Sequence, residues 1–127
     1  MADIIRSDLG KAVFAILKPD EELMEGVKEV AEKSGIDFGV FSMIGTLKQS
    51  SFGFYSPSMR PVTMKEPLEI LSCIGNVRKQ NGELRVHAHI SISDSKFHSY
   101  GGHLLEGNII DHVGELLLIG TTQPRET

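Results

Sequence analysis

The sequence predicts an α+β domain that is mostly sheet. A single convincing amphipathic helix lies near the N-terminus, and from Asp37 onward short runs of strand-like residues are divided by turn signals. The chain has 127 residues, of which 40% are hydrophobic, enough for one core. No repeat or linker divides it. We therefore expect one domain over residues 1–127.

The helix is predicted between a short strand and a glycine. Lys11–Leu17 is an apolar run typical of a buried strand, and Lys18-Pro19-Asp20 interrupts it. Asp20 is the expected N-cap, followed by acidic residues that favour the positive end of the helix dipole. Ser34-Gly35 is expected to end the helix. Its apolar face consists of Leu23, Val27, Val30 and Ala31.

Strands account for most of the remaining chain. Gln80-Asn81-Gly82 indicates a hairpin turn between two of them, with a loop longer than the two-residue ideal. Ser56–Pro67 contains several prolines and is expected to be a crossing loop, and residues 121–127 are expected to be a loose tail. The predicted strands are Phe38–Ile44, Leu47–Tyr55, Pro67–Val77, Glu83–Ser93, a segment around Phe97–Leu105, and Val113–Ile119.

Charge and cysteine content narrow the classes of function. A net charge of −4 and the absence of a basic run argue against binding to nucleic acid. The single cysteine, Cys73, cannot form an intramolecular disulfide, so we expect a cytoplasmic protein. Neither a signal peptide nor a membrane-spanning run of about 20 apolar residues is present, so no membrane partner is expected.

Two histidines in one predicted strand are the main functional signal. Glu83–Ser93 alternates strictly between polar and apolar residues, which places His87 and His89 on the same face. Same-face neighbours lie about 6.6 to 6.8 Å apart along a strand, close enough for two imidazoles to bind one metal ion. A third ligand could be His98 or His103, and Gly101-Gly102 would allow the second a close backbone approach.

Three imidazoles would favour zinc, with a fourth position left for water, a carboxylate or an anion. Zinc-bound water can ionise near neutral pH, so a hydrolase is possible, although spacing fixes no general base. The sequence contains no P-loop, G-x-S-x-G, C-x-x-C or H-E-x-x-H motif. Candidates for the base or the fourth ligand are Glu69, Asp94, Glu106 and Glu115.

Three segments together resemble the plants-and-prokaryotes-conserved (PPC) domain family: E-I-L-S-C-I-G-N-V (69–77), G-E-L-R-V-H-A-H-I-S-I-S (82–93) and G-G-H-L-L-E-G (101–107). The resemblance extends over nearly the whole chain. It implies one main helix packed on a strongly bent, mostly antiparallel sheet, and a homotrimer. It assigns the metal-ligand positions to His87, His89 and His103. His98 precedes Tyr100 and the glycine pair in a segment of unfixed register, so it is expected to contact a ligand from outside or to be a surface group.

Other interpretations remain alternatives. Plant members of this family contact DNA through an added AT-hook, and this chain has only Arg60-Pro61 in place of that core. The spacing around His87 and His89 is also similar to the cupin motif. However, Asp94 stands where a cupin has glutamate, and Gly82 is one residue too close to His87. The sequence thus predicts a metal-binding protein of unresolved role, with a DNA-binding or regulatory module and a metal-dependent enzyme as alternatives.

Overall fold

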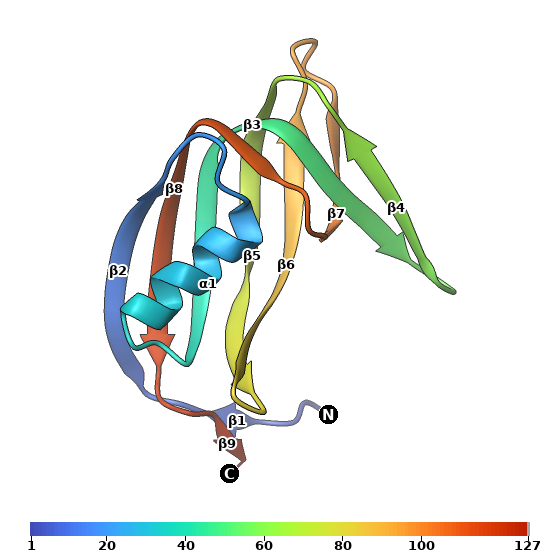
Figure 1. The fold of residues 1–127 in the computed structure, drawn as a ribbon. Coiled ribbons are helices and arrows are strands. Elements are labelled where there is room, and N and C mark those ends of the chain that lie inside the picture. The colour runs from blue at the N-terminus through green and yellow to red at the C-terminus, as the bar shows by residue number, and fades with distance from the viewer. Residues whose placement is uncertain (127) are drawn as a thin grey trace.

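The computed structural model describes residues 1–126 and confirms the α+β class. Helix α1 (Leu23–Lys33) lies against one face of a bent sheet (Figure 1). No helix among the described residues is long and apolar enough to cross a membrane. The strands are β1 (Ile5–Arg6), β2 (Leu9–Leu17), β3 (Phe38–Tyr55), β4 (Met59–Met64), β5 (Leu68–Gln80), β6 (Glu83–Ser93), β7 (Ser99–Leu104), β8 (Ile109–Thr121) and β9 (Arg125–Glu126).

The main sheet is organised around the long strand β3. The order of hydrogen-bonded strands is β2-β8-β3-β5-β6-β7, all pairings are antiparallel, and β4 and β7 also pair with β3. Strands β3, β5, β6 and β7 therefore form a closed circuit. This closure brings β7, at the end of the sheet order, back to the central strand.

Strand β3 corrects the prediction of two separate strands over Phe38–Ile44 and Leu47–Tyr55. It is one continuous strand of 18 residues in which the pairing register shifts around Gly45. Gly45 has φ of +152°, and a Cβ there would lie 2.2 Å from the carbonyl oxygen of Val113. Only glycine fits such a close approach, so what resembled a break between strands is a bulge inside one strand.

The start of the helix also differs from the prediction. Glu22, not Asp20, is the N-cap, and its Oε1 accepts a 2.9 Å hydrogen bond from the backbone N–H of Glu25. Asp20 has φ of +74° and forms an ion pair with Lys48 on β3. Hydrogen bonds to the segment before and at the start of β8 hold this turn: Asp20 N donates to the carbonyl oxygen of Ile110, and Glu22 Oε2 accepts from the N–H groups of Gly107 and Asn108. These long-range contacts override the local preference for aspartate as N-cap. The helix ends at Ser34-Gly35 as predicted.

The core lies between α1 and the sheet. The helix buries Leu23, Val27 and Ala31 against the sheet, where it contacts β6, β8 and β2. Contact is close, because a Cβ at Gly26 would lie 2.4 Å from Cδ2 of Leu17. The sheet residues that complete this part of the core are Leu17, Phe41, Met43, Leu116 and Leu118.

Two hairpins refine the sequence prediction. The turn between β5 and β6 is confirmed, but its loop is the two residues Asn81-Gly82, because Gln80 already pairs with Glu83. Both loop residues have positive φ, 53° and 79°, as in the type I′ turns that suit tight hairpins. The expected crossing loop over Ser56–Pro67 is wrong, since β4 pairs with the end of β3 to form an arm that points away from the body (Figure 1).

Strands β1 and β9 lie side by side beyond one end of the main sheet (Figure 1). Ile5 pairs with Glu126 and Arg6 with Arg125, so β1 and β9 form a separate two-stranded sheet. Residues 125–126 of the expected tail are thus paired, and Thr127 lies outside the described residues.

Candidate metal centre

Strand β6 presents two histidines on the sheet face opposite α1. Its bounds, Glu83–Ser93, match the predicted strand. The predicted alternation is confirmed. His87 and His89 are exposed, whereas Ala88, which lies between them, and Ile90, which follows them, are buried. The local sequence thus fixes which way both imidazoles point.

Strand β7 supplies the third histidine. His103 lies directly opposite His89 in the β6–β7 pairing and opposite Gly53 in the β7–β3 pairing. A Cβ at Gly101 would lie 2.2 Å from the carbonyl oxygen of Ile90, and one at Gly102 would lie 2.5 Å from that of Gly53. The glycine pair therefore permits the close backbone approach that places His103 beside the other two.

A buried polar network anchors the chain just after His103. Asn108 is fully buried, and its Oδ1 accepts hydrogen bonds from Ser50 Oγ at 2.6 Å and from Ser51 N at 3.1 Å. Its Nδ2 donates to the carbonyl oxygens of Ser51 and Leu105. A satisfied buried amide of this kind holds its neighbours in one arrangement. The network ties the end of β7 to β3 and so helps to fix the position of His103.

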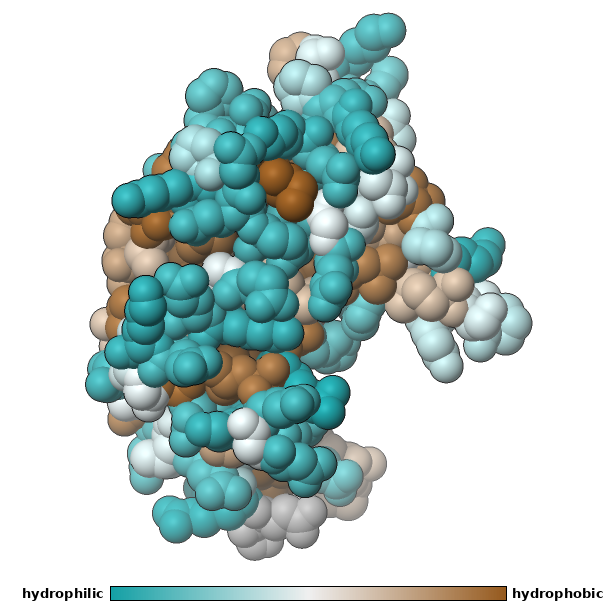
Figure 2. All heavy atoms as spheres, viewed as in Figure 1, coloured by the Kyte–Doolittle hydropathy of each residue, from teal (hydrophilic) through white to brown (hydrophobic). Residues whose placement is uncertain are grey.

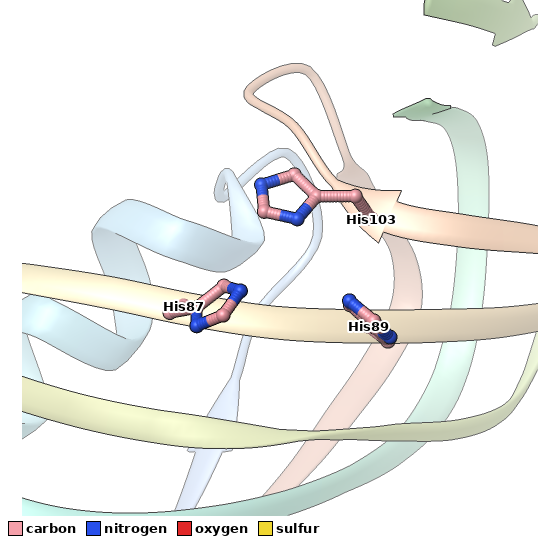
Figure 3. A group of neighbouring side chains, drawn as sticks. All are labelled: His87, His89 and His103. Atoms are coloured by element: carbon pink, nitrogen blue, oxygen red, sulfur yellow. The ribbon is translucent and has the colours of Figure 1, made fainter. Parts of the chain in front are cut away.

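The three imidazoles gather on one side of β6 and β7 (Figure 3). Ring centroids are 5.9 Å apart for His87 and His89, 5.2 Å for His87 and His103, and 5.7 Å for His89 and His103. One ligand nitrogen from each lies within 4.8 Å of the others. Zn–N bonds of about 2.0 to 2.1 Å in a tetrahedral site place two nitrogens about 3.4 Å apart. Small ring rotations reach that separation.

The surroundings of His103 favour its neutral imidazole form. Partial burial lowers the pKa of His103, and the nearby charges that His87 and His89 carry when protonated lower it further. A neutral imidazole is the form that binds a metal ion. The proximity of the three rings therefore makes His103 ready to act as a ligand near neutral pH.

Asp94 and His98 form a different cluster, in the turn between β6 and β7. His98 Nδ1 lies 3.5 Å from Asp94 Oδ2, and Asp94 Oδ1 accepts hydrogen bonds from the backbone N–H groups of Lys96 and His98. Burial raises the pKa of Asp94, but these hydrogen bonds outweigh it and leave the pKa below its usual value. Four residue pairs of the β6–β7 ladder separate this turn from the pair of His89 and His103.

The other acidic candidates also lie outside the histidine cluster. Among the described residues the cluster contains three histidines and no carboxylate. Glu69 is on β5 opposite Ser93, Glu106 is exposed after β7, and Glu115 is exposed on β8 between Ile16 and Ile44. A carboxylate as fourth ligand stays a prediction.

Burial raises the pKa of Cys73 to about 12, which disfavours the thiolate form as a ligand.

Sequence reasoning missed the residues beside His87. In the β5–β6 hairpin Asn76 pairs with His87, and Arg78 pairs with Arg85 in the next same-face row. A depression of about 290 Å³ lies there. The Asn-Gly turn is the sequence signal for this group of residues. A two-residue loop at Asn81-Gly82 sets the β5–β6 register, which pairs Asn76 with His87 and Arg78 with Arg85. The lining residues are Asn76, Arg78, Gln80, Arg85, Val86 and His87.

Comparison with known proteins gives a family match. Residues 6–121 match the model of the Plants and Prokaryotes Conserved (PCC) domain, the family abbreviated PPC above. Among curated proteins, the bifunctional protein GlmU of Synechococcus is 26% identical over 110 residues, which is 86% of this chain but 17% of that protein. The chain thus spans about a sixth of the length of that relative.

Three solved structures share the fold. A PPC protein from Pyrococcus horikoshii is 31% identical, with a TM-score of 0.85 over 93% of this chain and 83% of that one. A metal-containing protein from Archaeoglobus fulgidus is 26% identical, with a TM-score of 0.86 over 95% and 86%. A protein from Bacteroides thetaiotaomicron, named as a candidate DNA-binding protein, is 22% identical, with a TM-score of 0.81 over 90% and 83%, and shows the fold alone.

Proposed function

Because the chain belongs to the Plants and Prokaryotes Conserved domain family, we propose that it is a metal-binding member in which His87, His89 and His103 bind one divalent ion, zinc. The observation that carries this proposal is the convergence of three histidine nitrogens from two strands within 4.8 Å. The metal content named for the Archaeoglobus relative, which is 26% identical, supports it.

Zinc suits this donor set better than harder cations do. Three neutral imidazoles are typical of zinc sites, whereas magnesium and calcium prefer oxygen ligands. Since the cluster contains no carboxylate among the described residues, the fourth position would be open to water or to an external ligand. When bound, zinc would polarise the group in that position. The chain's own contribution is to hold three ligands on a rigid pair of strands.

A homotrimer, located in the cytoplasm, is part of the same proposal. The sheet face opposite α1 exposes large apolar side chains, each between 41% and 64% exposed in the single chain. By contrast, the α1 side is covered mainly by hydrophilic residues (Figure 2). A patch of this kind is typical of an interface between subunits. We call it the outer apolar face, and it consists of Phe14, Ile16, Val40, Ile44, Ile74 and Leu117.

The alternatives have less support. A metal-dependent hydrolase needs a general base, and no carboxylate joins the histidine cluster within the described residues. A DNA-binding module would have to overcome a net charge of −4. Binding or turnover assays of zinc-loaded protein separate both alternatives from a metal-binding role without catalysis.

The test is elemental analysis of untagged protein together with His87→Ala and His103→Ala variants. We expect about one zinc per chain in the wild type and loss of that zinc in both variants, because two imidazoles hold zinc much less tightly than three. His112→Ala is the matched control, since its side chain is 81% exposed and lies outside the cluster. Wild-type protein that cannot be loaded with zinc would refute the proposed centre. Light scattering on the same samples tests the trimer.

A further inference from the structure

Two arginines face each other beside the histidine cluster. Arg78 on β5 pairs directly with Arg85 on β6, and the next pair on the same face is Asn76 with His87. Like charges directly opposite in a sheet are destabilising unless something neutralises them. This arrangement concentrates positive charge next to a candidate metal ligand.

The protein neutralises these arginines only weakly. Arg78 Nε donates a 3.3 Å hydrogen bond to the neutral Oδ1 of Asn76. Arg85 Nη2 lies 3.9 Å from Glu83 Oε2, too far for a hydrogen bond, and both of these side chains are more than half exposed. Most guanidinium donors therefore have no protein acceptor within the described part of the chain. Such donors are suited to a ligand that accepts several hydrogen bonds.

The arginines line a depression that is continuous with the histidine cluster. His87 belongs both to the lining of the 290 Å³ depression and to the cluster of three imidazoles. Arg85 and His87 are same-face neighbours on one strand, about 6.6 to 6.8 Å apart at the backbone. A ligand in this depression could therefore contact the arginines and also occupy the open position of the bound metal.

We propose that this depression binds the phosphoryl group of a small molecule, with Arg78 and Arg85 as its cationic donors. This inference rests on the proposed metal centre, whose zinc would accept one phosphoryl oxygen. A phosphate dianion has enough oxygens to reach the metal and both guanidinium groups, whereas a monocarboxylate has only two. Asn76 turns its Oδ1 toward Arg78, which leaves its amide nitrogen as a further donor.

The depression has room for a small organic group attached to the phosphoryl group. A volume of about 290 Å³ is larger than inorganic phosphate requires and lies at the lower end of the range for small-molecule sites. Val86 adds an apolar contact and Gln80 another amide. Inorganic phosphate should therefore bind as a minimal probe of the site.

The test is calorimetric titration of inorganic phosphate into desalted, zinc-loaded protein at physiological salt. Removing one charged donor should weaken binding about tenfold, which corresponds to the usual contribution of a charge-assisted hydrogen bond. Arg78→Gln and Arg85→Gln remove these donors and keep the length of the side chain roughly constant. Arg60→Gln is the matched control, because Arg60 lies over the Phe54 ring and does not line the depression. Zinc content is measured in every sample.

Phosphate binding that weakens in the Arg78 and Arg85 variants, with Arg60→Gln and zinc content unchanged, supports the proposal. Equal affinity for acetate overturns the phosphoryl assignment. A zinc-loaded wild type with no heat of binding up to about 10 mM phosphate overturns the site while the metal centre stands, because even millimolar affinity would be detected. A wild type that takes up no zinc overturns the metal centre and this inference with it.

Discussion

The two faces of the same sheet carry similar apolar residues and have opposite environments. On the α1 side, Leu116 and Leu118 of β8 are fully buried. On the other side, Leu117 between them is 41% exposed, and its neighbours Phe14 and Ile16 on β2 are 64% and 50% exposed. The covered face stabilises the single chain, whereas the outer apolar face and the histidines beside it are available to partners and ligands.

The strand pairing places the outer apolar face next to the histidine cluster. One row across the sheet runs from Phe14 through Leu117, Ser42 and Ile74 to His89, and it ends at His103. The candidate metal centre therefore adjoins the outer apolar face, within which Ser42 and Glu115 are polar. Apolar composition alone does not reveal which face of the sheet α1 buries.

Truncating adjacent leucines on β8 should give the largest difference between the two faces. Leu118→Ala should lower the free energy of unfolding by about 3 kcal/mol, because it leaves a cavity against α1. Leu117→Ala should change the stability of an isolated chain by no more than about 0.5 kcal/mol. Urea denaturation of both variants measures the difference.

Repeating this denaturation at several protein concentrations tests the outer apolar face separately. If the outer apolar face is a subunit interface, the effect of Leu117→Ala should grow with protein concentration, because association stabilises the folded chain by mass action. The effect of Leu118→Ala should remain large at every concentration. Equal, concentration-independent losses in both variants would contradict the distinction between the faces.

A smaller loss of stability is expected from Gly102→Ala. The new Cβ would lie 2.5 Å from the carbonyl oxygen of Gly53, so β7 must move away from β3. We expect a cost of about 1–3 kcal/mol, as for other overpacked sites, together with reduced zinc uptake as His103 shifts. Ser99→Ala on the exposed start of the same strand is the control. Unchanged stability and zinc content in Gly102→Ala would show that the close approach is unnecessary.

The smallest effect concerns the pH dependence of metal-free protein. Because the pKa of His103 is lowered in the folded state, the unfolded chain binds more protons as the pH falls below about 6.5. The contribution of His103 to stability should therefore decline as the pH falls from that value through the folded pKa. NMR titration of the His103 ring measures the shift directly.

A variant with His87→Asn and His89→Asn provides the control for this titration. It removes both neighbouring charges, so the pKa of His103 should rise toward its ordinary value while the effect of burial remains. An unchanged pKa would show that burial alone accounts for the shift. His112→Asn, outside the cluster, should leave the titration as in the wild type.

The sequence predicted features set by local periodicity. The alternation in Glu83–Ser93 is a backbone property, so the strand bounds and the shared face of His87 and His89 were predictable. His103 was different, because its position depends on how β7 pairs with both β6 and β3. Spacing left His98 and His103 as candidates for the third ligand, and the family resemblance assigned it to His103. The structure places His103 in one cluster with His87 and His89.

The errors arose where distant contacts override local signals. Asp20 has the chemistry of an N-cap, but the contacts of Glu22 with Gly107 and Asn108 place the N-cap at Glu22. Prolines concealed strand β4, because an edge strand with one free side tolerates Pro61. Lys11–Leu17 was expected to be buried because both of its faces are apolar, yet α1 covers only one of them.

The arrangement of β3 also has a consequence for biosynthesis. Gly39 near its start pairs with Gly120 near the end of the chain, and β3 takes its other partners from segments made in between. Contacts so distant in sequence close slowly, since the intervening chain must first be ordered. The central sheet therefore cannot be completed on the ribosome until β8, which ends at Thr121, has emerged. Until then, the apolar side chains of β2 and β3 depend on protection from aggregation.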